Sequence, residues 1–381
     1  MNPIAIRMLS QQLICQQYSS PAEVVSYMGA IQAQDYRMCR WAVAMRMRRP
    51  SAEAFRKAFD CGDIVRLHLL RGTWQLVAGE DYRWMLALCA EKAEKTIRGW
   101  MKANKVAIDD GELHSIREIL VSTCEEKGSA TKEDFAEALR LRGIVMDDHR
   151  LTYHIRLSEL NGTLCSGMLS PMYATYALTD RKIPHSPLPD RDEMIRRLAL
   201  KYFQSHSPAT FEDYRWWSGL SAAECRRGME ALGTSLRRER WQGYEFYMLD
   251  SCRTRGFRKG VSLLLPPFDE YLIGYKSREL VLAPEHTHHS HTNNGIFFPV
   301  IVHDGVVCGN WSPWNESLKM DLFRPVDGSL SVDGSLSVDR LLSVDRVLSV
   351  DGSLSVGGSL SVDGVLSVDR QWEDFRKLRI C

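Results

Sequence analysis

Apolar residues recur at helical spacing near the start of the chain and then give way to short β-like runs. Ser20 followed by Pro21 has the signature of a helix start, because serine caps the free amides and proline fits the first turn. Helices followed by a short hairpin are the outline of a winged helix. The pattern predicts helices over residues 4–17, 21–31, about 35–47 and 50–62, and strands over 63–70 and 73–78.

The same outline recurs twice along the chain. Asn161-Gly162 is read as the turn of the second hairpin, and the Ser221–Glu224 spacing predicts a capping box. A proline-rich linker over 183–190 separates the second round from the third. The second round predicts two helices over 111–142, a helix over 148–160 and strands over 161–167 and 174–179; the third predicts helices over 191–206, 208–219 and 221–232 and strands over 235–241 and 244–249.

Residues 261–311 are different, because long apolar runs predict strands, including 261–275, and H-D-G-V-V (303–307) signals a hairpin. From Ser329 to Arg370 the chain becomes a six-residue repeat, S-L-S-V-D-G with variants, in seven copies. Leucine and valine fall two apart, so a β structure is conceivable. A tandem expansion in a surface loop, disordered or weakly β and without a function of its own, is the simpler interpretation.

We therefore predict an α+β fold of three tandem winged-helix units with an appended small β subdomain. The predicted domains are 1–105, which carries a Gln-x-Gln motif, 106–182, 183–260, a β subdomain of 261–324 with 371–381, and a low-complexity insert over 325–370.

Composition narrows the function classes. The net charge of +1 is the sum of −4 in the repeat region (326–370), which has seven Asp and three Arg, and +5 in the rest of the chain. The basic residues of that rest cluster at 37–49, 235–240 and 252–260. Such strips suit phosphate contacts. Ten scattered cysteines without C-x-x-C spacing predict reduced thiols in a bacterial-type cytosol. No apolar run reaches membrane-span length, and the N-terminus lacks signal-peptide features, so we expect no membrane partner.

Three groups of side chains have candidate chemistry. Four histidines within 285–294 are a weak metal-binding pattern, but no cysteine or ordered element fixes them, so we expect a mobile loop and no metal. Asp269 and Glu270 lie in an apolar run read as a strand, which would point them to opposite faces and leave one at the solvent. Trp216 and Trp217 are read as core rather than as a stacking platform for bases. No phosphate-binding glycine loop, H-E-x-x-H or nucleophile elbow occurs.

Five motifs occur together in one order over about residues 1–324: M-G-A-I-Q-A-Q-D-Y-R, L-L-R-G-T-W-Q-L-V-A-G-E-D-Y-R-W, S-P-A-T-F-E-D-Y-R-W-W-S-G-L, L-L-P-P-F-D-E-Y-L-I-G-Y and G-N-W. With these motifs the chain resembles the winged-helix crosslink-repair DNA glycosylases of the AlkZ/YcaQ type.

The resemblance implies a monofunctional enzyme that grips duplex DNA, excises N7-alkylated purines and unhooks interstrand crosslinks. The family's Gln-x-Gln or Gln-x-Asp signature maps onto Gln32 and Gln34, and Gln75 stands where many members have His. It also implies action as a monomer in the bacterial cytoplasm, associated with the nucleoid, and without a cofactor.

Glutamine suits this chemistry, because an N7-alkylated purine is cationic and leaves without a proton. The site then needs to hold a water near C1′ and to support a positive sugar, which amide dipoles do. Spaced at i and i+2 in an extended segment, both amides would lie on one side, with Ala33 as a spacer. The alternatives are a pair of capping glutamines at a helix junction and, for the whole chain, a non-catalytic DNA-binding protein, either a regulator or a lesion binder.

The remaining candidate residues complete the predicted site. The predicted DNA contacts are Arg37, Arg40, Arg66 and Arg71, and the predicted pocket residues are Asp35, Gln75, Asp269, Tyr275 and Trp311.

Overall fold

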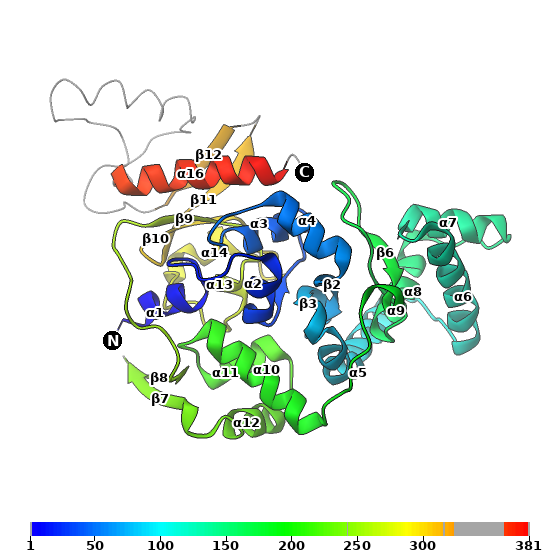
Figure 1. Ribbon diagram of the computed structural model, residues 1–381, viewed down its shortest axis with the longest axis horizontal. Coiled ribbons are helices and arrows are strands. Elements are labelled where there is room, and N and C mark those ends of the chain that lie inside the picture. The colour runs from blue at the N-terminus through cyan, green and yellow to red at the C-terminus, as the bar shows by residue number, and fades with distance from the viewer. Residues whose placement is uncertain (1, 242, 315–316, 324–361, 380–381) are drawn as a thin grey trace.

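The computed structural model describes residues 2–241, 243–314, 317–323 and 362–379. It combines helices with four small antiparallel sheets (Figure 1), and the predicted α+β class is confirmed. Within these residues no helix is long and apolar enough to cross a membrane. The nine cysteines they contain are all free thiols.

The first group of elements has the predicted helices and hairpin, with shorter bounds. The first helix ends seven residues early, because Gln12 adopts a left-handed φ of 56°. Strands β2 and β3 pair on either side of the Arg71-Gly72 turn, and β1 adds to the other edge of β3. The elements are α1 Pro3–Ser10, α2 Pro21–Met28, β1 Ile31–Gln32, α3 Met38–Ala44, α4 Ala52–Cys61, β2 Ile64–Leu69, β3 Thr73–Ala78 and the unpredicted α5 Gly79–Ala103.

The second group projects at one end of the molecule (Figure 1). Its hairpin forms, but Asn161-Gly162 is not the turn between the strands: Asn161 ends α8, and residues 167–174 connect β5 to β6. The Asn-Gly dipeptide, which is typical of a hairpin turn, therefore lies at the C-terminal end of a helix. The elements are α6 Asp110–Lys127, β4 Ala130–Thr131, α7 Lys132–Leu141, α8 Asp148–Leu160, β5 Leu164–Ser166, β6 Thr175–Leu178 and α9 Thr179–Lys182.

The third group follows the predicted order closely. The capping box of Ser221 and Glu224 is confirmed, and a second one, of Thr210 and Asp213, starts α11. Of the two tryptophans, Trp217 is buried and Trp216 is 40% exposed. The elements are α10 Arg191–His206, α11 Phe211–Ser218, α12 Ala222–Glu230, η1 Gly233–Ser235, β7 Leu236–Trp241 and β8 Tyr244–Leu249.

The last group is a four-stranded antiparallel sheet in the order β12-β11-β10-β9. Its predicted hairpin is confirmed, since Asp304 and Gly305 both take the positive φ that a tight β-turn requires. The elements are β9 Ser262–Leu265, α13 Glu270–Ile273, η2 Pro284–His286, α14 Thr287–Ser290, β10 Val300–His303, β11 Val306–Trp314, β12 Ser317–Leu322 and α16 Val362–Arg379.

Three expectations for this last group were wrong. The apolar run 261–275 is a strand only to Leu265, and the short helix α13 follows. The histidine segment, expected as a mobile loop, forms η2 and α14, with His289 stacked on Phe323. The last copies of the repeat enter α16, while residues 324–361 lie outside the described part.

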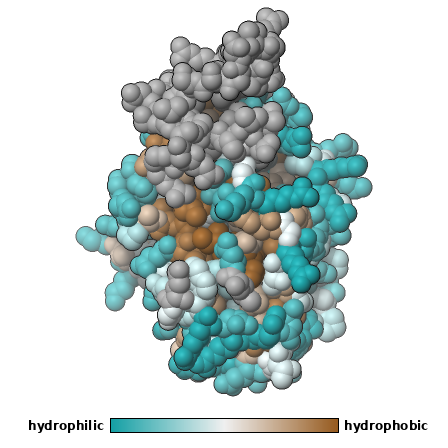
Figure 2. All heavy atoms as spheres, turned by 90° about the vertical axis from the view of Figure 1, so that its left-hand side faces the viewer, coloured by the Kyte–Doolittle hydropathy of each residue, from teal (hydrophilic) through white to brown (hydrophobic). Residues whose placement is uncertain are grey.

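Helix α16 closes the sheet of the last group. Trp372 and Phe375 pack against Trp311, and Gln371 Nε2 donates to the backbone oxygen of Ser262. A separate apolar core joins α5 to α10, α11 and α12 and contains Trp217. Figure 2 shows one face of the molecule, where a brown apolar area is surrounded by hydrophilic side chains.

Candidate active site

Gln32 lies on the short strand β1, opposite Gln75 of β3. Its side chain is buried, and its Oε1 accepts hydrogen bonds from Gln75 Nε2 and from Thr73 Oγ1, the latter at 3.2 Å. The amide group is therefore fixed by two neighbours on the adjacent strand. Gln32 Nε2, by contrast, donates to none of the described residues.

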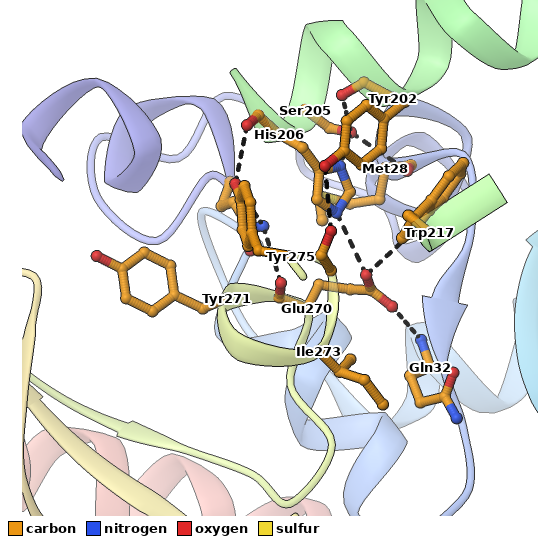
Figure 3. A network of polar contacts seen from close by, with 12 residues as sticks. Met28, Gln32, Tyr202, Ser205, His206, Trp217, Glu270, Tyr271, Ile273 and Tyr275 are labelled. Atoms are coloured by element: carbon orange, nitrogen blue, oxygen red, sulfur yellow. Dashed lines mark hydrogen bonds and ion pairs between the residues drawn. The ribbon is translucent and has the colours of Figure 1, made fainter. Parts of the chain in front are cut away.

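A buried carboxylate holds the backbone of Gln32 (Figure 3). Glu270 Oε1 accepts from the Gln32 amide at 2.7 Å, and Glu270 Oε2 accepts from Trp217 Nε1 at 3.1 Å and contacts His206 Nε2 at 3.2 Å. Four segments far apart in the chain thus meet at the side chain of Glu270: β1, α10, α11 and α13. Sequence reasoning singled out Glu270 but expected one carboxylate of the Asp269–Glu270 pair at the solvent; both are buried.

His206 is the neutral partner of this carboxylate. Its Nδ1 lies 2.8 Å from Ser205 Oγ, which leaves Nε2–H to donate to Glu270. Burial lowers the pKa of His206 below its ordinary value, although the Glu270 carboxylate opposes the shift. The imidazole therefore completes the network without adding a second charge.

This lowered pKa predicts acid sensitivity. The unfolded chain takes a proton on the imidazole more readily than the folded chain, so the free energy of unfolding should fall as the pH drops below about 6.5. We expect urea denaturation to give a lower value at about pH 5.5 than at about pH 7.5, and His206→Gln to weaken this dependence. The exposed His149→Gln is the matched control and should leave the dependence unchanged; equal pH dependence in both variants would contradict the assignment.

The predicted pocket residues Asp269 and Tyr275 flank α13 in sequence and hold this short helix in place through buried polar contacts. Asp269 forms a buried two-pronged ion pair with Arg46, at 2.8 and 2.9 Å. The Tyr275 hydroxyl donates to the His206 backbone oxygen at 2.9 Å. Both contacts fix the position of Glu270, so these two residues hold the site together from within the core.

The other predicted pocket residues fall in different places. Asp35 Oδ1 accepts from the amides of Arg37 and Met38 and so orders the start of α3. Trp311 is buried in the sheet of the last group, where its Nε1 donates to Leu265. Trp311 is therefore a core residue of that sheet, away from Gln32.

Gln34 differs from Gln32 in its surroundings. Strand β1 ends at Gln32, and Gln34 follows in a bend with an exposed side chain. The extended backbone therefore ends before Gln34, so the strand geometry that would place both amides on one side does not apply to Gln34. Ala33 is more than a spacer, because its amide donates to the Trp74 oxygen at 2.8 Å and its own oxygen accepts from Arg66 Nε at 3.0 Å.

The four arginines predicted to contact DNA are not equivalent. Arg37 is exposed. Arg40 is buried beside Pro171, and Arg66 is buried over the Trp74 ring at 3.7 Å. Arg71 is half-buried and donates to the backbone oxygens of Trp216 and Trp217. Arg37 alone of the four presents a guanidinium that a phosphate can reach without a rearrangement.

The sequence model of the family described as "DNA glycosylase AlkZ-like" matches residues 25–328. The chain belongs to this family. The match confirms the resemblance inferred from the five motifs, and it spans both Gln-x-Gln and Glu270.

The curated relative and the solved structure that this AlkZ-like chain matches both come from Streptomyces sahachiroi. An interstrand DNA cross-link repair glycosylase of Streptomyces sahachiroi is 25% identical over 337 residues, which cover 84% of this chain and 89% of the relative. The solved structure of the Streptomyces sahachiroi DNA glycosylase AlkZ superposes with a TM-score of 0.68 at 22% identity, covering 86% of this chain and 91% of that one. The second comparison shows a shared fold.

Proposed function

We propose that this protein is a monofunctional DNA glycosylase that excises N7-alkylated purines from duplex DNA and unhooks interstrand crosslinks by water attack at C1′. The observation that carries the proposal is the fixed Gln32: Glu270 binds its backbone amide, and Gln75 and Thr73 bind its side chain. A preorganised amide acts on a developing cation without the cost of reorienting water.

The leaving group explains why no strong acid is required. Alkylation at N7 gives the purine a positive charge, so breaking the bond from C1′ to N9 releases a neutral base and leaves the positive charge on the sugar. Water then adds to C1′ and loses a proton to solvent. The amides of Gln32 and Gln34 need only hold that water and face the sugar cation.

The amide of Gln32 has two arrangements available. As placed, its Oε1 is occupied by Gln75 and Thr73, while Gln75 Oε1 is buried without a partner. A joint rotation of both amide groups keeps their mutual hydrogen bond and gives the Thr73 hydroxyl and the Gln32 amide a common acceptor, Gln75 Oε1. It also moves Gln32 Oε1 to the place of Nε2, which donates to none of the described residues. That orientation suits a water and a sugar cation.

Gln75 should therefore tune the rate rather than abolish activity. We expect Gln75→Leu to slow base release by about tenfold, because one hydrogen bond contributes about 1–1.5 kcal/mol. Gln75→His, which restores a ring nitrogen opposite Gln32, should keep a rate close to that of the unaltered enzyme. Single-turnover release of 7-methylguanine measures both, and an equal loss in the two variants would contradict this role for Gln75.

The fold and the charges support duplex DNA as the partner. Each of the first three groups places helices before an antiparallel pair of strands, β2–β3, β5–β6 or β7–β8, which is the order expected of tandem winged helices. Exposed basic residues lie at Arg37 and in the segment around Arg255, Arg258 and Lys259. We further propose that the protein acts as a monomer in the cytoplasm, without a cofactor.

Base release from alkylated DNA tests the proposal directly. Duplex DNA carrying 7-methylguanine, and a duplex crosslinked by a nitrogen mustard, should yield free base and abasic sites when mixed with the protein. The alternative, a non-catalytic winged-helix regulator or lesion binder, predicts binding without base release from either substrate. Release from neither substrate, with binding retained, would favour that alternative.

A further inference from the structure

The loop 167–174, which connects β5 to β6, carries a cluster of exposed apolar side chains. Met168 and Met172 are each 58% exposed, and Tyr173 is 57% exposed. Single exposed apolar residues are ordinary, but three within six residues at one loop tip form a surface that water solvates poorly. Figure 1 shows the loop reaching from β6 toward α4.

The backbone of this loop is anchored in the first group of elements. Leu169 is buried in the apolar cluster that also contains Ile31 and Ala33, the two neighbours of Gln32. Its amide donates to Asp60 Oδ1 at 2.6 Å, and the Tyr36 hydroxyl donates to the Ser170 oxygen at 3.0 Å. The exposed side chains are therefore held in place by the core that positions the Gln-x-Gln motif.

The loop tip also contacts the segment that comes just after Gln34 in the sequence. Arg37 Nη2 lies 3.0 Å from Met172 Sδ, and Arg40 Nη2 donates to the Pro171 oxygen at 3.4 Å. An apolar tip beside an exposed guanidinium has the composition of a wedge that enters a base stack while the cation meets a phosphate. A wedge next to the site would lower the cost of exposing the lesion, which is a few kcal/mol for unstacking.

We propose that Met172 and Tyr173 insert into duplex DNA beside the lesion and open the base stack at the Gln-x-Gln site. This inference rests on the proposed function, because the lesion defines where opening is required. It assigns the loop a part in recognising double-stranded substrate, while the excision chemistry stays with the glutamines.

The test compares Met172→Ser/Tyr173→Ser with Leu141→Ser/Val145→Ser, two exposed apolar residues of the same group at a different place. The probe is a duplex in which 2-aminopurine adjoins a 2′-fluorinated 7-methylguanine nucleotide, whose glycosidic bond resists cleavage. The unaltered protein and the control should raise the 2-aminopurine fluorescence, and the Met172/Tyr173 variant should give at least about a fivefold smaller rise.

Excision assays separate opening from chemistry. The Met172/Tyr173 variant should release 7-methylguanine from duplex DNA about tenfold more slowly, yet match the unaltered protein on methylated single strands, which need no opening. Unchanged fluorescence, or equal losses on single and double strands, would overturn the proposal. If the unaltered protein releases no base at all, the proposed glycosylase function fails, whereas the fluorescence measurement still decides the role of the loop.

Discussion

Replacing both Gln32 and Gln34 with alanine is expected to lower the rate of 7-methylguanine release from duplex DNA by at least about 100-fold, the usual effect of removing one preorganised transition-state dipole. The substitution removes both amides that would hold water and face the sugar cation. Binding to DNA should persist, since the proposed phosphate contacts come from basic side chains elsewhere. Single-turnover kinetics with saturating protein isolates the chemical step.

The single variants should separate the two glutamines. Gln34 is exposed and Gln32 is buried between Glu270 and Gln75, so Gln34→Ala should change the rate without changing the free energy of unfolding. Gln32→Ala should lower both. The half-buried Gln17→Ala serves as a control for loss of an amide away from the site. Full activity in the double variant would refute the proposed mechanism.

Removal of the Glu270 side chain should have the largest effect on stability. Glu270→Ala leaves the Gln32 amide, Trp217 Nε1 and His206 Nε2 without their shared acceptor. Leaving buried hydrogen-bond donors without the side chain that accepts from them costs about 3–5 kcal/mol. We therefore expect the free energy of unfolding to fall by that amount and base release to be lost as well. Urea denaturation at neutral pH measures the change.

Two further variants define the cause of that loss. Glu270→Gln keeps an oxygen acceptor for the Gln32 amide but turns its NH₂ group toward Trp217 Nε1 and His206 Nε2. We therefore expect the free energy of unfolding to fall by an intermediate amount, about 1–3 kcal/mol. Glu285→Ala removes an exposed carboxylate from the same group and should leave the free energy of unfolding nearly unchanged. A Glu270→Ala protein as stable as the unaltered protein would mean that the carboxylate does not organise the site.

Local signals account for most of the fold that could be predicted. Ser20-Pro21, Ser221–Glu224 and Asp304-Gly305 mark their helices and hairpin because capping and turn chemistry act within a few residues. Helix α5 was missed because no side chain caps its start at Gly79. The four-residue helix α13 was read as strand because a short apolar run has no clear period.

The candidate site was predictable only in part. The Gln-x-Gln motif and Gln75 were found from family motifs, and the structure places Gln75 opposite Gln32. The carboxylate beneath them was not assigned to the site, since Glu270 is 238 residues from Gln32 in sequence and only the tertiary fold joins them. His206 carried no signal, and Trp217 was read only as a core residue, because a buried histidine and a buried tryptophan are usual in protein cores.

The docking of α16 has a consequence for the gene. Trp372 and Phe375 pack against Trp41 and Trp311, so α16 covers the apolar core beside the sheet. The six-residue repeat before them is encoded by a whole number of codons. Slippage that adds or deletes complete copies keeps the reading frame and preserves this covering helix, whereas a frameshift within the repeat would remove it. Natural variants of the gene should therefore differ in the number of repeat copies but not in the reading frame after the repeat.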